Sequence, residues 1–258
     1  MSAGQPTVRK WRVSTHLTGW LHLLLTAVAL SASMIVNSGV STAPIPRDNP
    51  EALLREATSQ LLEVSKAARS YAKDDPERYY AEVERVMLQV LDIDYFARGV
   101  MATYASSRLY RSLQTDAERD AFRARIESFV KAIKRVFMVK YADALLTFEG
   151  ERIDLASVPA AGDAPDHASV QQTIYDVGGE TYQVQYSLHR VREGGWMIYN
   201  VIVEGVNLGQ VYRSQFAEAV EKHRGDVDYV VNHWVDLMIE HDAVEKAVEK
   251  STKSGGGG

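Results

Sequence analysis

The sequence predicts an α+β fold, a single domain in which a four-stranded antiparallel sheet packs against several helices. Apolar residues recur every three or four positions as far as Leu145, and again after Gly205, which is typical of amphipathic helices. Between these regions the period shortens, and Val, Ile, Tyr and Thr become frequent, as in strands. Gly178-Gly179 and Gly194-Gly195 predict hairpin turns. Helices and strands segregated along a chain are typical of α+β architecture.

The first 43 residues are predicted to be a secretory signal peptide. Three basic residues, Arg9, Lys10 and Arg12, precede the segment Trp20–Val36, which carries no formal charge and is rich in Leu, Ala and Val. Small residues follow it, which completes the layout of an export signal. An uncleaved membrane anchor is the alternative, although the apolar run is short of the roughly 20 residues that a spanning helix needs. Either way, we expect the rest of the chain to cross the inner membrane.

Four helices are predicted before the sheet. Asn49 is a suitable N-cap for the first helix. Pro50 then occupies the first helical position, where its missing N–H costs nothing because that group would be unpaired there in any residue. The second is predicted to begin at Asp75-Pro76 and the third, a short one, near Asp94. The fourth and longest begins at a capping box, Thr115–Glu118, and its apolar positions continue to Leu145.

The four strands are predicted at Thr147–Leu155, Val170–Val177, Glu180–Val191 and Trp196–Glu204. A polar loop, Pro159–Ala168, is expected between the first two. The third strand is one-sided, because its apolar residues alternate with polar ones; they are Tyr182, Val184, Tyr186 and Leu188.

The fourth strand is apolar on both predicted faces. Strict alternation puts Trp196, Ile198 and Ile202 on one face and Met197, Tyr199, Val201 and Val203 on the other. Two explanations remain open. The strand is central and covered on both sides, as in ordinary core, or the helices and sheet do not close completely and leave an apolar cavity.

After the sheet, helical spacing returns from Leu208, is broken at Gly225, and resumes from Val227 to Met238. Residues 242–258 end in four glycines and are predicted to be a disordered tail. Residues 44–241 are therefore expected to form the folded domain.

The sequence offers no recognisable catalytic, cofactor or metal motif. It has no cysteine, which excludes disulfides and thiolate metal sites. Serine-nucleophile elbows, phosphate-binding glycine loops and paired zinc histidines are absent. His233 and His241 could meet carboxylates on one helix, but solvated polar positions are the simpler interpretation. The net charge of −5, without a long basic stripe, argues against nucleic-acid binding.

Several short blocks resemble the MlaC (toluene-tolerance) family of periplasmic phospholipid-binding proteins. They occur in order between about residues 50 and 238, and the set is more specific than any one block. The blocks are Asp92–Arg98, Thr115–Phe122, Lys140–Leu145, Trp196 with Tyr199–Leu208, and Tyr212–Phe216.

The resemblance implies a curved sheet and packed helices that hold lipid tails in an apolar cavity. It implies a periplasmic shuttle, not an enzyme and without a cofactor, that passes phospholipid between an outer-membrane lipoprotein complex and an inner-membrane ABC transporter. Some related members occur in hopanoid-producing bacteria, so a hopanoid-like cargo is a further possibility. A small-molecule enzyme on a cone-shaped α+β fold is the alternative; it would need a carboxylate or histidine in the cavity with a shifted pKa. A docking protein without a cavity is the third hypothesis.

Candidate lipid-binding residues come from the long helix and the last two strands. They are Phe129, Ile133, Val136, Phe137, Tyr141, Val184, Tyr186, Leu188, Ile198 and Val201. Ordinary core is the alternative role for each of them. Arg213, in the last block of the resemblance, is expected to pair with a carboxylate.

Overall fold

The computed structural model describes residues 43–146, 148, 152–158, 165–175, 179, 181–192 and 194–241. The predicted signal peptide up to residue 42, the predicted tail at 242–258 and residues 159–164 of the predicted loop lie outside this part. Within it, no helix is long and apolar enough to cross a membrane.

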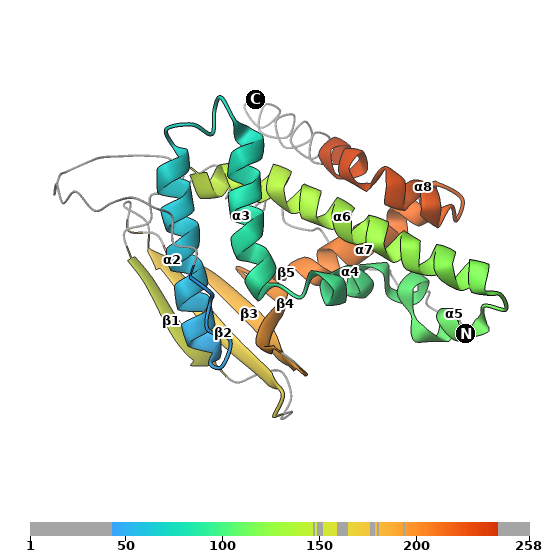
Figure 1. Ribbon diagram of the computed structural model, residues 1–258, viewed down its shortest axis with the longest axis horizontal. Helices are drawn as coiled ribbons and strands as arrows, with labels where there is room; N and C mark the ends of the chain where they lie inside the picture. Colours follow the sequence, from blue (N-terminus) through green and yellow to red (C-terminus); the bar gives the residue numbers. More distant parts are fainter. Residues whose placement is uncertain are drawn as a thin grey trace, which may run out of the picture.

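The helices follow the predicted order (Figure 1). Their bounds are α2 Pro50–Ala68, α3 Pro76–Val90, α4 Ile93–Met101, the 3-10 helix η1 Ala102–Ala105, α5 Ser107–Ser112, α6 Asp116–Leu146, α7 Leu208–Lys222 and α8 Val227–Asn232. The backbone is helical again over 234–241. The sequence patterns did not predict η1 and α5, which are too short to show a helical period.

Local capping explains where the helices begin. Asn49 Oδ1 accepts hydrogen bonds from the backbone N–H groups of residues 51 and 52 at the start of α2. At the start of α6, Glu118 N–H donates to Thr115 Oγ1 at 3.2 Å, and Thr115 N–H donates to Glu118 Oε2 at 2.8 Å. The predicted capping box is therefore confirmed, and it satisfies donors that the first helical turn leaves unpaired.

The five strands form one antiparallel sheet in sequence order. They are β1 Arg152–Val158, β2 His167–Tyr175, β3 Thr181–Val191, β4 Gly195–Val203 and the two-residue β5 Val206–Asn207. The four predicted strands are confirmed, and β5 is an addition. The predicted start of the first strand at Thr147 is wrong, because α6 extends to Leu146, half-buried against the core, and β1 begins only at Arg152.

A β-bulge in β4 overturns the predicted alternation of that strand. Leu188 pairs with Ile198, but the next residue of β3, Ser187, pairs with Asn200, so that Tyr199 is the extra residue. Because directly paired residues share a face, Ile198 and Val201 lie on the same side of the sheet. The prediction that they lie on opposite faces is therefore wrong.

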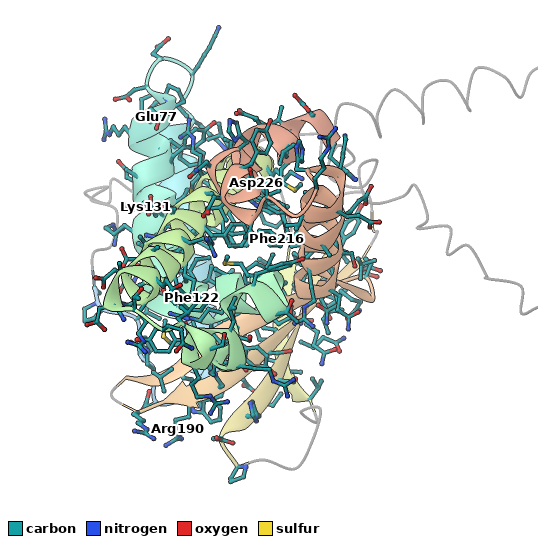
Figure 2. All side chains as sticks on the ribbon, turned by 90° about the vertical axis from the view of Figure 1, so that its right-hand side faces the viewer. Glu77, Phe122, Lys131, Arg190, Phe216 and Asp226 are labelled. Atoms are coloured by element: carbon teal, nitrogen blue, oxygen red, sulfur yellow. The ribbon has the colours of Figure 1, made fainter. Side chains whose placement is uncertain are left out.

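The helices cover one face of the sheet, here called the inner face. Helices α2, α3, α4 and α7 make the main helical contacts with the strands, whereas α6 packs chiefly on other helices. Figure 1 shows α2 lying across the sheet, α3 meeting it with one end near β4, and α6 extending away from it beside α8. In Figure 2, Phe216 lies inside the helical part of the molecule, and Glu77, Lys131 and Arg190 lie at its periphery.

The edge of β4 is covered by three separate segments. Trp196 N–H donates to the Arg47 carbonyl at 2.7 Å, and Asp92 N–H donates to the Ile198 carbonyl at 2.8 Å. Further along, β5 pairs with Ile202 and Val203. This cover satisfies backbone groups that an open edge would expose to other chains. It also fixes the junction of α3 and α4 against the sheet.

Candidate functional site

The structure brings the five candidate residues of the sheet onto the inner face. They form two cross-strand pairs, Leu188 with Ile198 and Tyr186 with Val201, together with Val184, which is two positions before Tyr186 on β3. Two-residue periodicity predicted the grouping within β3, and the bulge brings the β4 residues onto the same face.

The inner face is only partly covered by helices. Leu188 and Ile198 are 0% and 3% exposed, so they belong to the core. Val184, Tyr186 and Val201 are only half-buried, although they lie on the same face. Burial of the phenol raises the pKa of Tyr186, although the residue as a whole is only half-buried. An apolar side chain on a helix-covered face retains accessible surface where the covering layer does not pack closely against it.

A short chain of hydrogen bonds crosses the inner face from α2 to β3. Gln172 Nε2 donates to Thr58 Oγ1 at 3.1 Å, and the Tyr186 hydroxyl donates to Gln172 Oε1 at 2.7 Å. Sequence reasoning missed Gln172, since a glutamine in a strand usually faces solvent. Its place between Val170 and Ile174 at two-residue spacing was the only available signal.

The candidate residues of α6 divide into two groups. Phe129 is fully buried, and its ring centroid lies 4.8 Å from that of Phe216 and 5.3 Å from that of Trp234. It therefore belongs to the packing of α6 against α7 and the segment that follows α8. Ile133 and Val136 are likewise buried, at 0% and 2% exposure.

Phe137 and Tyr141 lie nearer the end of α6, where they contact Tyr212 of α7 and, in the case of Phe137, also α4. The Phe137 ring packs on Phe96 of α4 and Tyr212 of α7, with centroids 5.4 and 5.8 Å away. The Tyr141 and Tyr212 hydroxyl groups are 3.0 Å apart, and Tyr141 remains half-buried. The same end of α6 is fixed to α3 by the Tyr79 hydroxyl, which donates to the Ala142 carbonyl at 2.7 Å.

A family model described as MlaC protein matches residues 55–236. This chain belongs to the MlaC family. The family predicted from the sequence blocks is therefore confirmed.

Two curated MlaC-family relatives are similar along much of the chain. The toluene tolerance protein ttg2D of Pseudomonas putida is 28% identical over 210 residues, which cover 81% of this chain and 91% of that protein. The intermembrane phospholipid transport system binding protein MlaC of Haemophilus influenzae is 25% identical over 171 residues, covering 66% of this chain and 73% of its own.

A solved structure has the same fold. It is a phospholipid-binding protein from Ralstonia solanacearum in complex with a phospholipid, and it superposes with a TM-score of 0.56 at 19% identity. The match covers 76% of this chain and 98% of that chain.

Catalytic groups are not found on the inner face of the strands that the structure describes: the side chains there include no carboxylate and no imidazole. His189 Nε2 lies 2.9 Å from Asp92 Oδ2. His189 lies on the outer face, however, because it follows Leu188 in β3 and Leu188 lies on the inner face. Among the described residues, no group of His, Asp and Glu could hold a metal ion. Arg213 Nε donates to the Gly99 carbonyl at 2.8 Å, so its expected carboxylate partner is replaced by a backbone oxygen.

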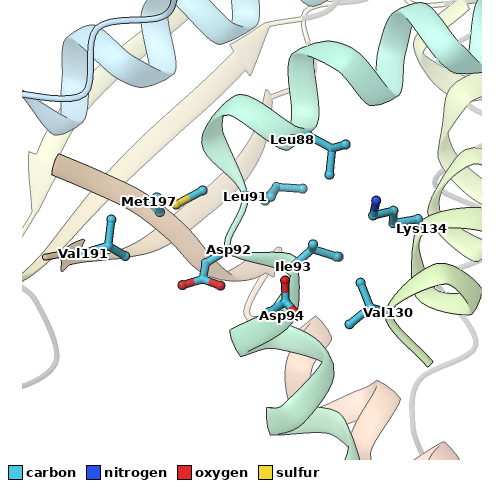
Figure 3. Close-up of a pocket in the computed structure, with 9 residues that line it drawn as sticks. All are labelled: Leu88, Leu91, Asp92, Ile93, Asp94, Val130, Lys134, Val191 and Met197. Carbon is cyan, nitrogen blue, oxygen red and sulfur yellow. The ribbon is translucent and has the colours of Figure 1, made fainter. Parts of the chain in front are cut away.

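A separate pocket of about 390 Å³ lies beside the α3–α4 junction (Figure 3). Its walls are Leu88, Leu91, Asp92, Ile93, Asp94, Val130, Lys134, Val191 and Met197. Val191 and Met197 come from the outer face of the β3–β4 hairpin, on the same side as His189. None of the ten candidate residues lines this pocket, so it is distinct from the inner face.

Proposed function

We propose that this protein is a periplasmic lipid-binding shuttle. It carries phospholipid, or another apolar lipid such as a hopanoid, between the outer and inner membranes as the soluble component of an ABC-type lipid transport system. The observation that carries the proposal is the accessible apolar surface that Val184, Tyr186 and Val201 keep on a helix-covered face.

Lipid transport of this kind requires that the acyl chains be shielded from water, and it requires no catalysed reaction. A lipid that leaves a membrane exposes its acyl chains to water, at a cost of about 0.8 kcal/mol for each methylene group. A wall of aliphatic and aromatic side chains removes this cost without any reacting group. The headgroup can remain in water, so the site does not need a buried charge.

The proposed wall combines the sheet with the end of α6. Val184, Tyr186 and Val201 contact the acyl chains, Leu188 and Ile198 form the packed base beside them, and Phe137 and Tyr141 contribute from α6. Phe129, Ile133 and Val136 lie earlier on the apolar stripe of α6 and belong to the packed core, where they are buried.

The proposed partners follow from the family. They are an inner-membrane ABC lipid transporter and an outer-membrane lipoprotein complex, between which the shuttle exchanges lipid. The name of the Haemophilus influenzae relative supports this assignment, since it describes a binding protein of an intermembrane phospholipid transport system. The predicted export signal supports the periplasmic location.

Lipid extraction tests the proposal directly. The protein is purified from a periplasmic fraction, extracted with organic solvent and examined by mass spectrometry, beside an unrelated periplasmic protein carried through the same steps. We expect lipid in near-stoichiometric amount only with this protein, and uptake of fluorescent phospholipid from vesicles after delipidation. Clean extracts in repeated preparations, together with no uptake from vesicles, would rule the shuttle out.

A further inference from the structure

Gln172 is a polar residue in an apolar wall. It is 4% exposed and lies on the inner face, paired with Leu155 on one side and Val184 on the other. The neighbouring glutamines Gln171 and Gln183 lie on the outer face, where water can reach the sheet. Burying an amide is unfavourable unless its hydrogen bonds are satisfied, so this position needs a physical reason.

The hydrogen-bond chain leaves part of that amide unused. A glutamine side chain can donate two hydrogen bonds and accept about two. Gln172 donates one to Thr58 and accepts one from Tyr186, which leaves one N–H and one lone pair. The Tyr186 oxygen, having donated its own proton, can still accept a hydrogen bond.

Attachment of α2 to the sheet does not by itself explain this arrangement. An apolar residue of similar size at position 172 would join the two layers without the cost of burying an amide. Tyr186, whose hydroxyl bonds to this amide, is itself only half-buried on the wall that the proposed lipid contacts. One small group that both donates and accepts would satisfy the unused donor and acceptor.

We propose that Gln172 and Tyr186 form a hydrogen-bonding subsite for a hydroxyl group on the hydrophobic part of the bound lipid. The hydroxyl donates its proton to the Tyr186 oxygen and accepts the free N–H of Gln172. An ester carbonyl has no proton to donate, so it can accept the N–H of Gln172 but cannot bond to the Tyr186 oxygen. Hydroxylated lipids therefore bind in preference to lipids without a hydroxyl group. This inference rests on the proposed lipid-binding function and adds to it a class of cargo, whether hydroxylated chain or hydroxylated ring system.

Competition binding tests the subsite. The delipidated full-length protein is loaded with fluorescent phospholipid, which is displaced by stearic acid or by monohydroxylated stearic acids that differ only in the carbon carrying the hydroxyl. Since the subsite lies at one depth, we expect one positional isomer to bind roughly three- to tenfold more tightly than stearic acid, the effect of one or two neutral hydrogen bonds. Cholesterol against cholestane provides the same comparison on a ring system.

Two variants locate the effect. Tyr186→Phe and Gln172→Met keep nearly the same volume, so we expect both to fold, and thermal unfolding checks this. Each should reduce the preference, measured as the ratio of the affinities for hydroxylated and unsubstituted stearic acid in the same variant, to less than twofold. Tyr199→Phe is the matched control, because Tyr199 packs on His189 on the outer face, and it should keep the full preference.

The outcomes separate the two proposals. If fluorescent phospholipid binds but no hydroxylated competitor is preferred by the wild-type protein, the subsite is wrong and the shuttle stands. A preference that survives in Tyr186→Phe and Gln172→Met also refutes the subsite, as does a loss of stability in the variants with no change in lipid preference. A protein that takes up no lipid refutes both proposals.

Discussion

Enlarging Val201 distinguishes a lipid wall from a packed core. Val201 is half-buried on the inner face and pairs directly with Tyr186, while Leu188, two residues further along β3 on the same face, is fully buried. In a close-packed core, Val→Phe forces neighbouring side chains out of their rotamers and costs about 1–3 kcal/mol of stability. Beside unoccupied space the added ring is accommodated without this cost.

The expected loss therefore appears in lipid binding and not in folding. A phenylalanine ring at position 201 displaces roughly two methylene groups of a bound chain, worth about 0.8 kcal/mol each. The total of about 1.6 kcal/mol corresponds to roughly 15-fold weaker binding. We expect Val201→Phe to keep the wild-type free energy of unfolding within about 0.5 kcal/mol when both proteins are free of lipid.

The assays are urea unfolding of delipidated protein and titration with a fluorescent phospholipid. Delipidation is essential, since a bound ligand raises the apparent stability of the native state. Leu188→Phe is the matched control, and it should lose about 1–3 kcal/mol of unfolding free energy. If Val201→Phe is destabilised as much as Leu188→Phe, or binds lipid like the wild type, the reasoning that Val201 faces a hollow is wrong.

Three further predictions concern stability and ionisation. The Arg125 guanidinium, 2.6 Å from Asp228, lowers the pKa of that carboxyl. The ion pair therefore stabilises the fold at pH values above the unfolded-state pKa, and this stabilisation is lost as pH falls through the folded-state pKa. Asp228→Asn should cost about 0.5 kcal/mol of unfolding free energy in urea at neutral pH and nothing in strong acid. Hydrogen bonds from the Ser157 hydroxyl and N–H lower the pKa of Glu51, and Ser157→Ala should raise it in an NMR titration. Gly195→Ala should cost roughly 3 kcal/mol or more of unfolding free energy, because φ is +76° and a Cβ would lie 2.0 Å from a backbone oxygen.

Each of these has its own control. An Asp228→Asn effect of equal size in strong acid would show that the ion pair is not its cause. An unchanged Glu51 titration in Ser157→Ala would remove the serine from the explanation of that pKa. Gly205→Ala shares a positive φ, +79°, but has open space around the new Cβ, so it should cost only about 1–2 kcal/mol. Equal losses at Gly195 and Gly205 would contradict the steric argument.

The sequence determined the order and type of the long elements, because these depend on local physics. The cap at Asn49 and the capping box at Thr115 fixed two helix starts within one or two residues. Two-residue alternation placed Val184, Tyr186 and Leu188 on one face of β3, which the structure confirms. Side-chain periodicity follows from backbone geometry, and it can be read without knowing what each element packs against.

Contacts between distant parts of the chain decided the rest. The bulge at Tyr199 arises from the pairing of β3 with β4. The local sequence did not predict that this bulge places Val201 on the face that the helices cover. Phe129 and Phe137 share an apolar stripe on α6, yet one packs on Trp234 and the other on Phe96. Gln172 donates a hydrogen bond to Thr58, which is 114 residues away in the sequence. Period and propensity act within a few residues, whereas strand register and side-chain partners depend on non-local packing, and only the tertiary structure contains that information.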